Sequence, residues 1–312
     1  MYSHLKTALA AALIQDGIVQ SSGERRWTHY RLTQSDKHSA DFSLAEALSE
    51  DRVWELFFKD RITQLASVEK EILNYGATEM INNVIDHSGA TNLHVEIWRT
   101  AISTTLKLTD NGIGIFQKIA SALHLDDLRQ SLLELGKEKF TTDPKRHTGE
   151  GVFFTSRMFD CFSIRSSDLL FTRTAISDDW FVELASKQLK GTSITMILLH
   201  PARRNLESVF ARYSSGPEDY RFAKTQVPLR LAAFGDENLL SRSSAKRVLA
   251  RIERFDEVLL DFKEVDSIGP AFADEIFRVF AREHPKVQLI VINANAQITA
   301  MIRRAQSHSQ PD

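Results

Sequence analysis

The chain has 312 residues, 43% of them hydrophobic and 26% charged, with a formal net charge of −2 and one cysteine. This length can supply two domains with a substantial core, and the near-neutral charge does not indicate a nucleic-acid or membrane-surface partner. One cysteine excludes an internal disulfide, and no apolar run is long enough to cross a bilayer. Because the N-terminus lacks the pattern of a signal peptide, we expect a soluble cytoplasmic protein.

Residues 1–33 predict a helix followed by a hairpin. Apolar residues recur at helical spacing over His4–Leu13, and two short strands, at Ile18-Val19 and Tyr30–Leu32, flank a basic turn. This arrangement resembles the recognition helix and wing of a winged helix-turn-helix, without the helices that come before them. The resemblance implies a partial winged-helix unit with DNA as a partner. Residues 34–48 are polar and are expected to form a linker.

Residues 49–205 alternate helices and strands and predict one α/β domain. Because several strands follow one another near its end, we expect a mixed sheet with helices on one face. The predicted helices are Glu50–Gln64, Val68–His87, Phe116–Leu135 and Gly151–Phe159. The predicted strands are Leu93–Trp98, Thr104–Thr109, Phe162–Ser166, Leu169–Thr174, Trp180–Leu184 and Ser193–Leu199. Residues 206–222 have the composition of a second linker.

Residues 223–306 alternate strand and helix strictly, which predicts a smaller α/β domain, and residues 307–312 would be a tail. The predicted strands are Val227–Ala233, Glu257–Phe262 and Val287–Asn293. The helices that follow them are predicted at Asn238–Arg254, Ala271–Glu283 and Gln297–Ala305.

The helix predicted over Val68–His87 carries a polar face. Glu79, Asn83 and His87 recur at every fourth position and therefore stack along the helix, away from the apolar stripe that would face the sheet. A carboxylate, an amide and an imidazole in register could hold a cation and support proton transfer. The same triple also fits a solvated helix face, and both alternatives stay open at this point.

Asp110-Asn111-Gly112-Ile113-Gly114 directly follows a predicted strand. A carboxylate at a strand end can accept a hydrogen bond from an exocyclic amine such as that of adenine. Glycines let the backbone approach a ligand closely and adopt positive φ. By itself this pattern also fits an ordinary turn.

Two further elements follow in the chain. The stretch His147–Gly151 opens a predicted helix, where glycines leave backbone N–H groups and the positive end of the helix dipole open to a phosphate. Lys137, Lys145 and Arg146 precede it and could meet a triphosphate or lie on a surface loop. The last element, Lys190–Ser193, begins the final strand of the domain.

In this order and spacing, the four elements resemble the GHKL superfamily of ATP-binding folds, which includes gyrase and the histidine kinases. The resemblance covers about residues 49–200 and implies an α/β sandwich that binds ATP with Mg²⁺. It implies that Asn83 holds the magnesium, that Asp110 reads adenine with support from Thr192, and that Glu79 positions or deprotonates the attacking group. The other residues that it implies at the nucleotide are His87, Gly112, Gly114, Ile115, Lys145, Arg146, Thr148, Gly149 and Gly151.

The same resemblance implies that Lys137–Glu150 form a mobile lid over ATP. Histidine kinases carry their acceptor histidine on a helical hairpin before this domain. Only His4, His29 and His38 precede the domain here, and none lies on a long helical pattern. We therefore do not expect self-phosphorylation on histidine.

The segment Asp261–Gly269 runs from a predicted buried strand into a helix. Its Asp266-Ser267 pair resembles the strand-to-helix turn of STAS domains, the fold of anti-anti-sigma factors, in which a GHKL kinase phosphorylates the serine. The residues Ala271–Phe277 resemble a STAS-like family of unknown function that often follows such ATPase domains. Ser267 is therefore a candidate phosphosite. A serine here also fits a turn or an N-cap, and Ile268 departs from the STAS pattern.

Together these patterns predict a signalling protein with ATP, Mg²⁺ and a protein partner. The first hypothesis is a GHKL-type ATPase or protein kinase that acts on a STAS-like or sigma-factor-related partner. The alternatives are an ATP-responsive regulator that binds DNA through residues 1–33, and a module that binds nucleotide without transferring phosphate.

Overall fold

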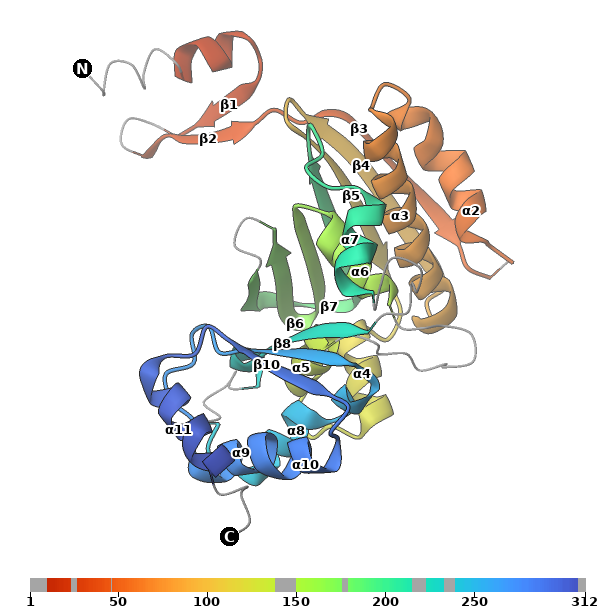
Figure 1. Ribbon diagram of the computed structural model, residues 1–312. Helices are drawn as coiled ribbons and strands as arrows, with labels where there is room; N and C mark the ends of the chain where they lie inside the picture. The colour runs from red at the N-terminus through yellow and green to blue at the C-terminus, as the bar shows by residue number, and fades with distance from the viewer. Residues whose placement is uncertain are drawn as a thin grey trace, which may run out of the picture.

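The computed structural model describes residues 10–23, 27–45, 47–137, 150–175, 179–214, 223–232 and 239–307. They form an N-terminal helix and hairpin, a five-stranded sheet with its helices, and a three-stranded sheet with its helices (Figure 1). The α/β fold class is therefore confirmed. No helix within these ranges is both long and apolar enough to span a membrane.

The N-terminal unit has the expected local structure. Residues 10–15 are helical, and β1 (Val19–Ser22) pairs antiparallel with β2 (His29–Leu32). Figure 1 draws this unit beside one end of the larger sheet, and the side chains of Trp27 and Tyr30 are exposed. Its resemblance to a winged helix stays a prediction.

The five-stranded sheet has the order β3-β4-β5-β7-β6. Its strands are β3 (Ser35–Ser43), β4 (Asn92–Thr100), β5 (Ser103–Asp110), β6 (Cys161–Thr174) and β7 (Asp179–Leu199). Each pairing in it is antiparallel, whereas we expected a mixed sheet. The short connections between β4 and β5 and between β6 and β7 account for two of these pairings, because parallel neighbours need a long crossover.

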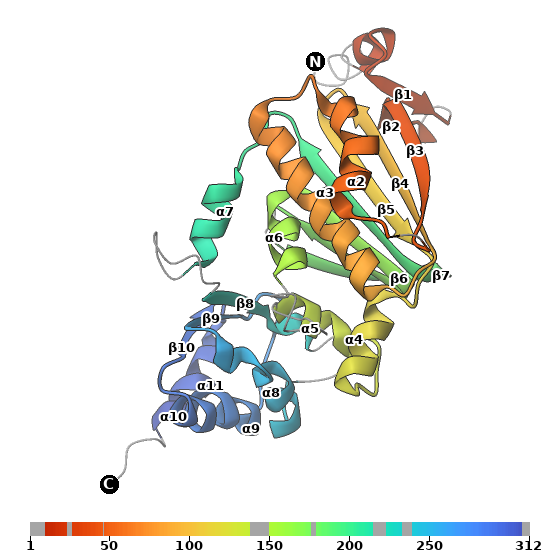
Figure 2. The ribbon, with the colours of Figure 1, turned by 90° about the vertical axis from the view of Figure 1, so that its right-hand side faces the viewer.

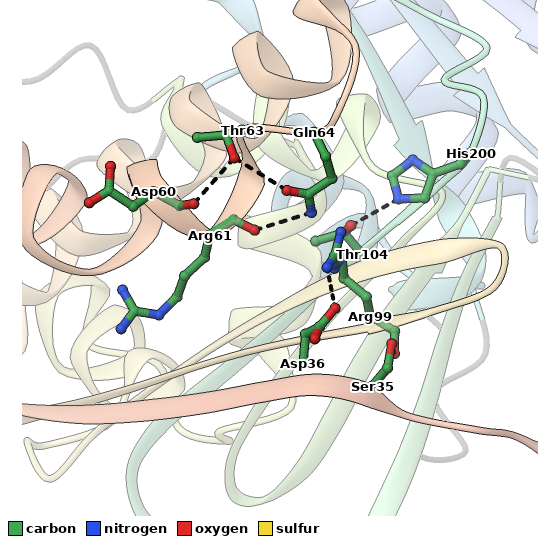
Figure 3. A network of polar contacts seen from close by, with 9 residues as sticks. All are labelled: Ser35, Asp36, Asp60, Arg61, Thr63, Gln64, Arg99, Thr104 and His200. Carbon is green, nitrogen blue, oxygen red and sulfur yellow. Dashed lines mark hydrogen bonds and ion pairs between the residues drawn. The ribbon is translucent and has the colours of Figure 1, made fainter.

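Strand β3 corrects the expectation that residues 34–48 form a linker. It pairs with β4 along its length and forms the edge of the sheet. Most of its side chains are polar and exposed, and Ala40 and Phe42 alternate toward the core. Figure 3 shows Arg99 of β4 reaching Asp36 across the pair, with which it forms an ion pair. An edge strand solvated on one face carries too few apolar residues to be recognised from periodicity.

The helices of this domain lie over one face of the sheet and at the end of the sheet that is next to the smaller domain (Figure 2). They are α2 (Glu50–Val53, continuing as irregular helix to Ile62), α3 (Ser67–His87), α4 (Ile115–Leu123), α5 (Gln130–Lys137), α6 (Gly151–Met158) and α7 (Leu206–Tyr213). Helices α3 and α6 cross closely at Gly76, where a methyl group would lie 2.3 Å from the Phe159 ring.

Two expectations about these helices are corrected. The single helix expected over Phe116–Leu135 is divided into α4 and α5, because the chain adopts the left-handed conformation at His124 (φ 52°). The linker expected over residues 206–222 begins with α7, whose N-cap Asn205 accepts a hydrogen bond from the Ser208 N–H.

The smaller sheet is parallel, in the order β10-β9-β8. The strict alternation predicted an α/β domain, and a helix between successive strands allows their parallel pairing. Its strands are β8 (Lys224–Pro228), β9 (Glu257–Asp261) and β10 (Gln288–Ile292). Its helices are α8 (Arg242–Leu249), α9 (Pro270–Asp274, continuing through Phe280 to α10, Ala281–Glu283) and α11 (Ala296–Ser307).

Candidate functional site

The polar face of α3 forms one wall of the candidate site. Glu79, Asn83 and His87 stand one turn apart, and the buried residues of α3 lie on another side of the helix. The amide Nδ2 of Asn83 is buried and has no hydrogen-bond partner within the described part of the chain. A buried donor without a partner lowers the stability of the folded state, so this amide is a candidate for contact with a ligand.

Glu79 lies against the first residue of α6. A methyl group at Gly151 would lie 2.2 Å from Oε2 of Glu79, so a larger residue would displace the carboxylate from this position. Tyr75 stands one turn before Glu79. Burial raises the pKa of its hydroxyl, and the nearby charges of Glu79 and Glu150 raise it further. Two carboxylates and the N-terminus of a helix therefore meet beside α3.

The turn after β5 forms the second wall. Asp110 is the last residue of β5 and is 4% exposed, and its Oδ1 accepts a hydrogen bond from the Gly112 N–H at 2.8 Å. The Ile113 N–H donates to the carbonyl of Ser88, the residue that ends α3, at 3.0 Å. A methyl group at Gly112 would lie 2.3 Å from the same carbonyl oxygen. The turn is thus bound to the end of α3.

Two glycines with positive φ join this turn to β6 and β7. Gly114 (φ 88°) is the N-cap of α4, and a methyl group on it would lie 2.4 Å from Oγ of Ser166. Gly191 (φ 85°) approaches the backbone of Asp110 so closely that a methyl group would lie 2.1 Å from the Asp110 carbonyl oxygen. Both positions therefore require glycine on conformational and steric grounds.

Thr192 connects the same elements through its hydroxyl. Its Oγ1 accepts a hydrogen bond from the Ile115 N–H at 3.0 Å, at the start of α4. Burial raises the pKa of Asp110, and hydrogen bonds from Gly112 and Thr192 counteract part of that rise. Asp110 is thus a carboxyl group in a largely dry environment with a threonine beside it.

The structure brings most of the expected residues into two adjoining groups. Glu79 and Gly151 form one, with Asn83 and His87 following on the same helix, and the glycine turn with Ile115 and Thr192 forms the other. The expected residues Lys145, Arg146, Thr148 and Gly149 lie outside the described residues.

Sequence reasoning missed two supporting residues, Ser88 and Ser166, and included Gly191 only as a member of the Lys190–Ser193 element. Gly191 left a signal, as a glycine directly before Thr192 at the start of the final predicted strand. Ser88 and Ser166 are ordinary serines whose contacts with the glycine turn depend on how α3 and β6 meet it in space.

The donor set at α3 fits a magnesium ion that shares its ligands with phosphate. No group of three or more His, Cys, Asp or Glu side chains in the described ranges could by itself hold a metal ion. Mg²⁺ commonly takes one or two protein ligands and completes its shell with water and phosphate oxygens. The amide of Asn83, with Glu79 one turn away, matches that requirement.

Ser267 lies exposed in the segment between β9 and α9. The alternative that it caps α9 is wrong, because Gly269 is the N-cap and no side chain caps this helix. The segment is held by Asn295, whose Nδ2 donates to the carbonyl of Asp266 at 2.8 Å. Phosphorylation of Ser267 stays a prediction, and the exposed hydroxyl is accessible to a second protein.

Residues 244–299 match a known family, the STAS-like domain of unknown function (DUF4325). The matched residues run from α8 into α11. They include β9, α9 and β10, and the exposed Ser267 between β9 and α9. A search of curated proteins gave no match. The resemblance of the larger domain to the GHKL superfamily stays a prediction, and the C-terminal part of the chain, at residues 244–299, carries a STAS-like domain.

Proposed function

We propose that the larger domain binds ATP with Mg²⁺, and that the protein is a GHKL-type ATPase or protein kinase acting on a STAS-like partner. The observation that carries this proposal is the contact between the glycine turn and the end of α3. This contact holds the turn after Asp110 against the end of the helix that carries Asn83, which supports assigning both residues to one site.

Asp110 is suited to the adenine base. A flat, apolar base requires a dry cavity, and its exocyclic amine requires an acceptor within it. Asp110 is buried at a strand end, and Thr192 stands beside it with a hydroxyl that can bridge to a second edge of the base. Gly112 keeps the turn close to the carboxylate, since a methyl group on it would lie 2.9 Å from Oδ1 of Asp110.

Asn83 and the N-terminus of α6 are suited to the magnesium triphosphate. The Nδ2 of Asn83, which has no partner among the described residues, would donate to a phosphate oxygen, and the amide oxygen would bind the metal. Gly151 begins α6, where backbone N–H groups and the helix dipole favour a phosphate. The resemblance adds Lys145, Arg146, Thr148 and Gly149 as further phosphate contacts.

Glu79 is the residue on which phosphate transfer depends. Phosphoryl transfer needs mostly positioning and charge stabilisation, together with a group that orients the attacking oxygen. Glu79 meets the α6 N-terminus at Gly151, so its carboxylate faces the position proposed for the phosphates. The attacking oxygen would come from water in an ATPase or from a serine hydroxyl of a STAS-like partner in a kinase.

Calorimetric titration of the full chain with ATP and Mg²⁺ tests the binding. Asn83→Ala should lower the affinity for ATP about 10-fold or more and make it independent of Mg²⁺, because a ligand of the ion is lost. Asn74→Ala, on an exposed position of the same helix, is the matched control and should bind like the wild type. Equal affinity of the Asn83→Ala and Asn74→Ala variants would remove Asn83 from the site.

Incubation with ATP labelled at the γ-phosphate tests the transfer. Label on the wild type that disappears in the Ser267→Ala variant would identify Ser267 as an acceptor within the chain. Label on neither protein, together with released phosphate, would favour an ATPase. Binding without label or release would favour a module that only binds nucleotide.

A DNA-binding regulator is the second candidate function, and the exposed N-terminal hairpin favours it. Arg31 and His29 are exposed on β2, near Trp27, a side chain able to stack or pack on a partner. An electrophoretic shift of DNA by the full chain that disappears when residues 1–33 are deleted would support this function. A shift that survives the deletion would contradict it.

A further inference from the structure

Helix α5 is buried on all sides from Ser131 to Lys137, although it lies at the end of the larger domain. Figures 1 and 2 draw it between α4 and the small sheet, next to β8. At Gly136 a methyl group would lie 3.0 Å from Cδ1 of Leu231 and 3.8 Å from Cδ of Pro228. A glycine thus lets α5 approach the segment at the end of β8, and its leucines extend the core of the C-terminal domain.

Two charged side chains of α5 are also buried against the C-terminal domain. Glu134 is 7% exposed and Lys137 3%, and the Lys137 ammonium donates to Oε1 of Glu134 at 2.8 Å. The same ammonium donates to the backbone carbonyl of Arg247 in α8, and Arg251 pairs with the other carboxylate oxygen of Glu134. Buried charges need such partners, so these contacts fix how α5 sits on the domain.

The end of α5 is held in addition by β8. The hydroxyl of Thr225 donates to the backbone carbonyl of Lys137 at 2.8 Å, which satisfies one of the carbonyl groups left open at a helix C-terminus. Lys137 was expected at the start of a mobile lid, with its charge toward the nucleotide. It is instead the most buried charged residue of the contact between α5 and the C-terminal domain.

Helix α5 is joined to the candidate site by α4. Helix α4 begins at the glycine turn itself, with Gly114 as its N-cap and the Ile115 N–H bound to Thr192. The two helices pack on each other, and the Leu125 N–H, after the end of α4, donates to the carbonyl of Ala120 at 2.9 Å. This packing gives a path by which a shift of α5 can reach the turn beside Asp110.

We infer that the STAS-like domain controls ATP affinity through α5, by holding α4 and the glycine turn in the arrangement that receives the nucleotide. This inference rests on the proposed function and names its regulation. Coupling between two sites is reciprocal, so ATP strengthens the contact between α5 and the C-terminal domain, and a partner that displaces α5 releases ATP. The segment of α8 and β8 around Arg247, Arg251 and Thr225 is where such a partner would act.

Two substitutions in the full chain test the coupling by calorimetric titration with ATP and Mg²⁺. Arg251→Met removes the ion pair with Glu134, and Thr225→Val removes the hydrogen bond to Lys137 while keeping the side-chain shape. Each should lower the affinity for ATP about 5-fold or more, because part of the binding free energy is then used to order the site. Lys246→Met, on the exposed side of α8, is the matched control and should keep the affinity of the wild type.

Hydrogen exchange of the α5 amides supplies the second readout. Exchange should be faster in the Arg251→Met and Thr225→Val variants, and slower in the wild type when ATP and Mg²⁺ are present. Faster exchange with unchanged ATP affinity in both variants would overturn the coupling and leave the proposed function standing. Absence of ATP binding by the wild type would instead overturn the proposed function, and the inference with it.

Discussion

Two buried aspartates end the central strands of the two sheets, and their surroundings differ. Asp110 is the last residue of β5, the third of five strands in order, and Asp261 is the last residue of β9, the middle of three. The side chains are 4% and 8% exposed. The two aspartates therefore occupy nearly the same position in their sheets. The difference between them lies in the groups that surround the carboxylates.

Asp261 connects the ends of three parallel strands. Its Oδ1 accepts hydrogen bonds from the Lys263 N–H at 3.0 Å and from Nδ2 of Asn293 at 2.8 Å. Its Oδ2 accepts one from Nε2 of Gln226, on β8, at 2.9 Å. Because donors from all three strand ends converge on it, this carboxylate has a structural role.

Asp110 is held in a different way. Its hydrogen bonds come from its own turn, at Gly112, and from Thr192, and burial still raises its pKa. A buried carboxyl whose pKa is raised destabilises the folded state when it is ionised, and such groups are concentrated at functional sites. The burial of Asp110 beside the glycine turn, together with its raised pKa, therefore makes it a candidate site residue.

The largest effect is expected from Asp261→Ala. This change leaves the amides of Gln226 and Asn293 and the Lys263 N–H without their acceptor, so the free energy of unfolding should fall by about 2–4 kcal/mol. Urea denaturation measures it. Asp266→Ala, at an exposed position nearby, should change the value by less than about 0.5 kcal/mol. Equal effects of the two changes would contradict the structural role of Asp261.

The pH dependence of ATP binding should report on Asp110. Because burial raises its pKa, the carboxylate proposed to accept the adenine amine is protonated at a higher pH than an ordinary aspartate. ATP affinity should fall by up to about 10-fold per pH unit below the raised pKa. For stability the sign is opposite: the contribution of Asp110 is fully present below the unfolded value of 3.8 and is lost as the pH rises through the folded pKa. The same titration with Asp110→Asn distinguishes protonation of Asp110 from protonation of ATP, because the variant should lack the loss of affinity that comes from Asp110.

A smaller effect is expected on the stability of the Asp110→Asn variant. The amide oxygen can still accept from Gly112, and a buried charge is removed, so the unfolding temperature without ATP should stay constant or rise slightly. Thermal unfolding followed by circular dichroism measures this. A loss of stability as large as that of Asp261→Ala would mean that both aspartates are structural.

The smallest effect is expected from Gly151→Ala. The added methyl group clashes with Oε2 of Glu79, which is the flexible end of a side chain. The free energy of unfolding should therefore change by less than about 1 kcal/mol. Glu79 must move aside, and phosphate release or transfer should slow several-fold while ATP affinity is retained. Unchanged rates at unchanged affinity would separate Glu79 from the chemistry.

The sequence alone predicted what depends on local pattern. The helix with Glu79, Asn83 and His87, the strand that ends at Asp110, and the alternating order of the small domain all follow from periodicity and strand-end chemistry. Gly114 was expected from the same reasoning, because positive φ at a turn selects glycine.

What the sequence could not supply depends on tertiary contacts. Strand β3 is polar because it lies at an edge. Helix α4 ends at His124, whose left-handed conformation is not indicated by the residue type. Gly191 contacts Asp110, and Lys137 contacts α8, although each pair is far apart in the chain. Neither contact produces a periodic pattern in the sequence.

The most direct test is a calorimetric titration of the full chain with ATP and Mg²⁺, using the wild type, Asp110→Asn and the exposed control Asp266→Asn. The wild type and Asp266→Asn should bind with the same affinity, and Asp110→Asn should bind about 10-fold or more weakly, because a charged hydrogen bond to the base is lost. Equal affinity of all three proteins would contradict the assignment of Asp110 to the nucleotide site.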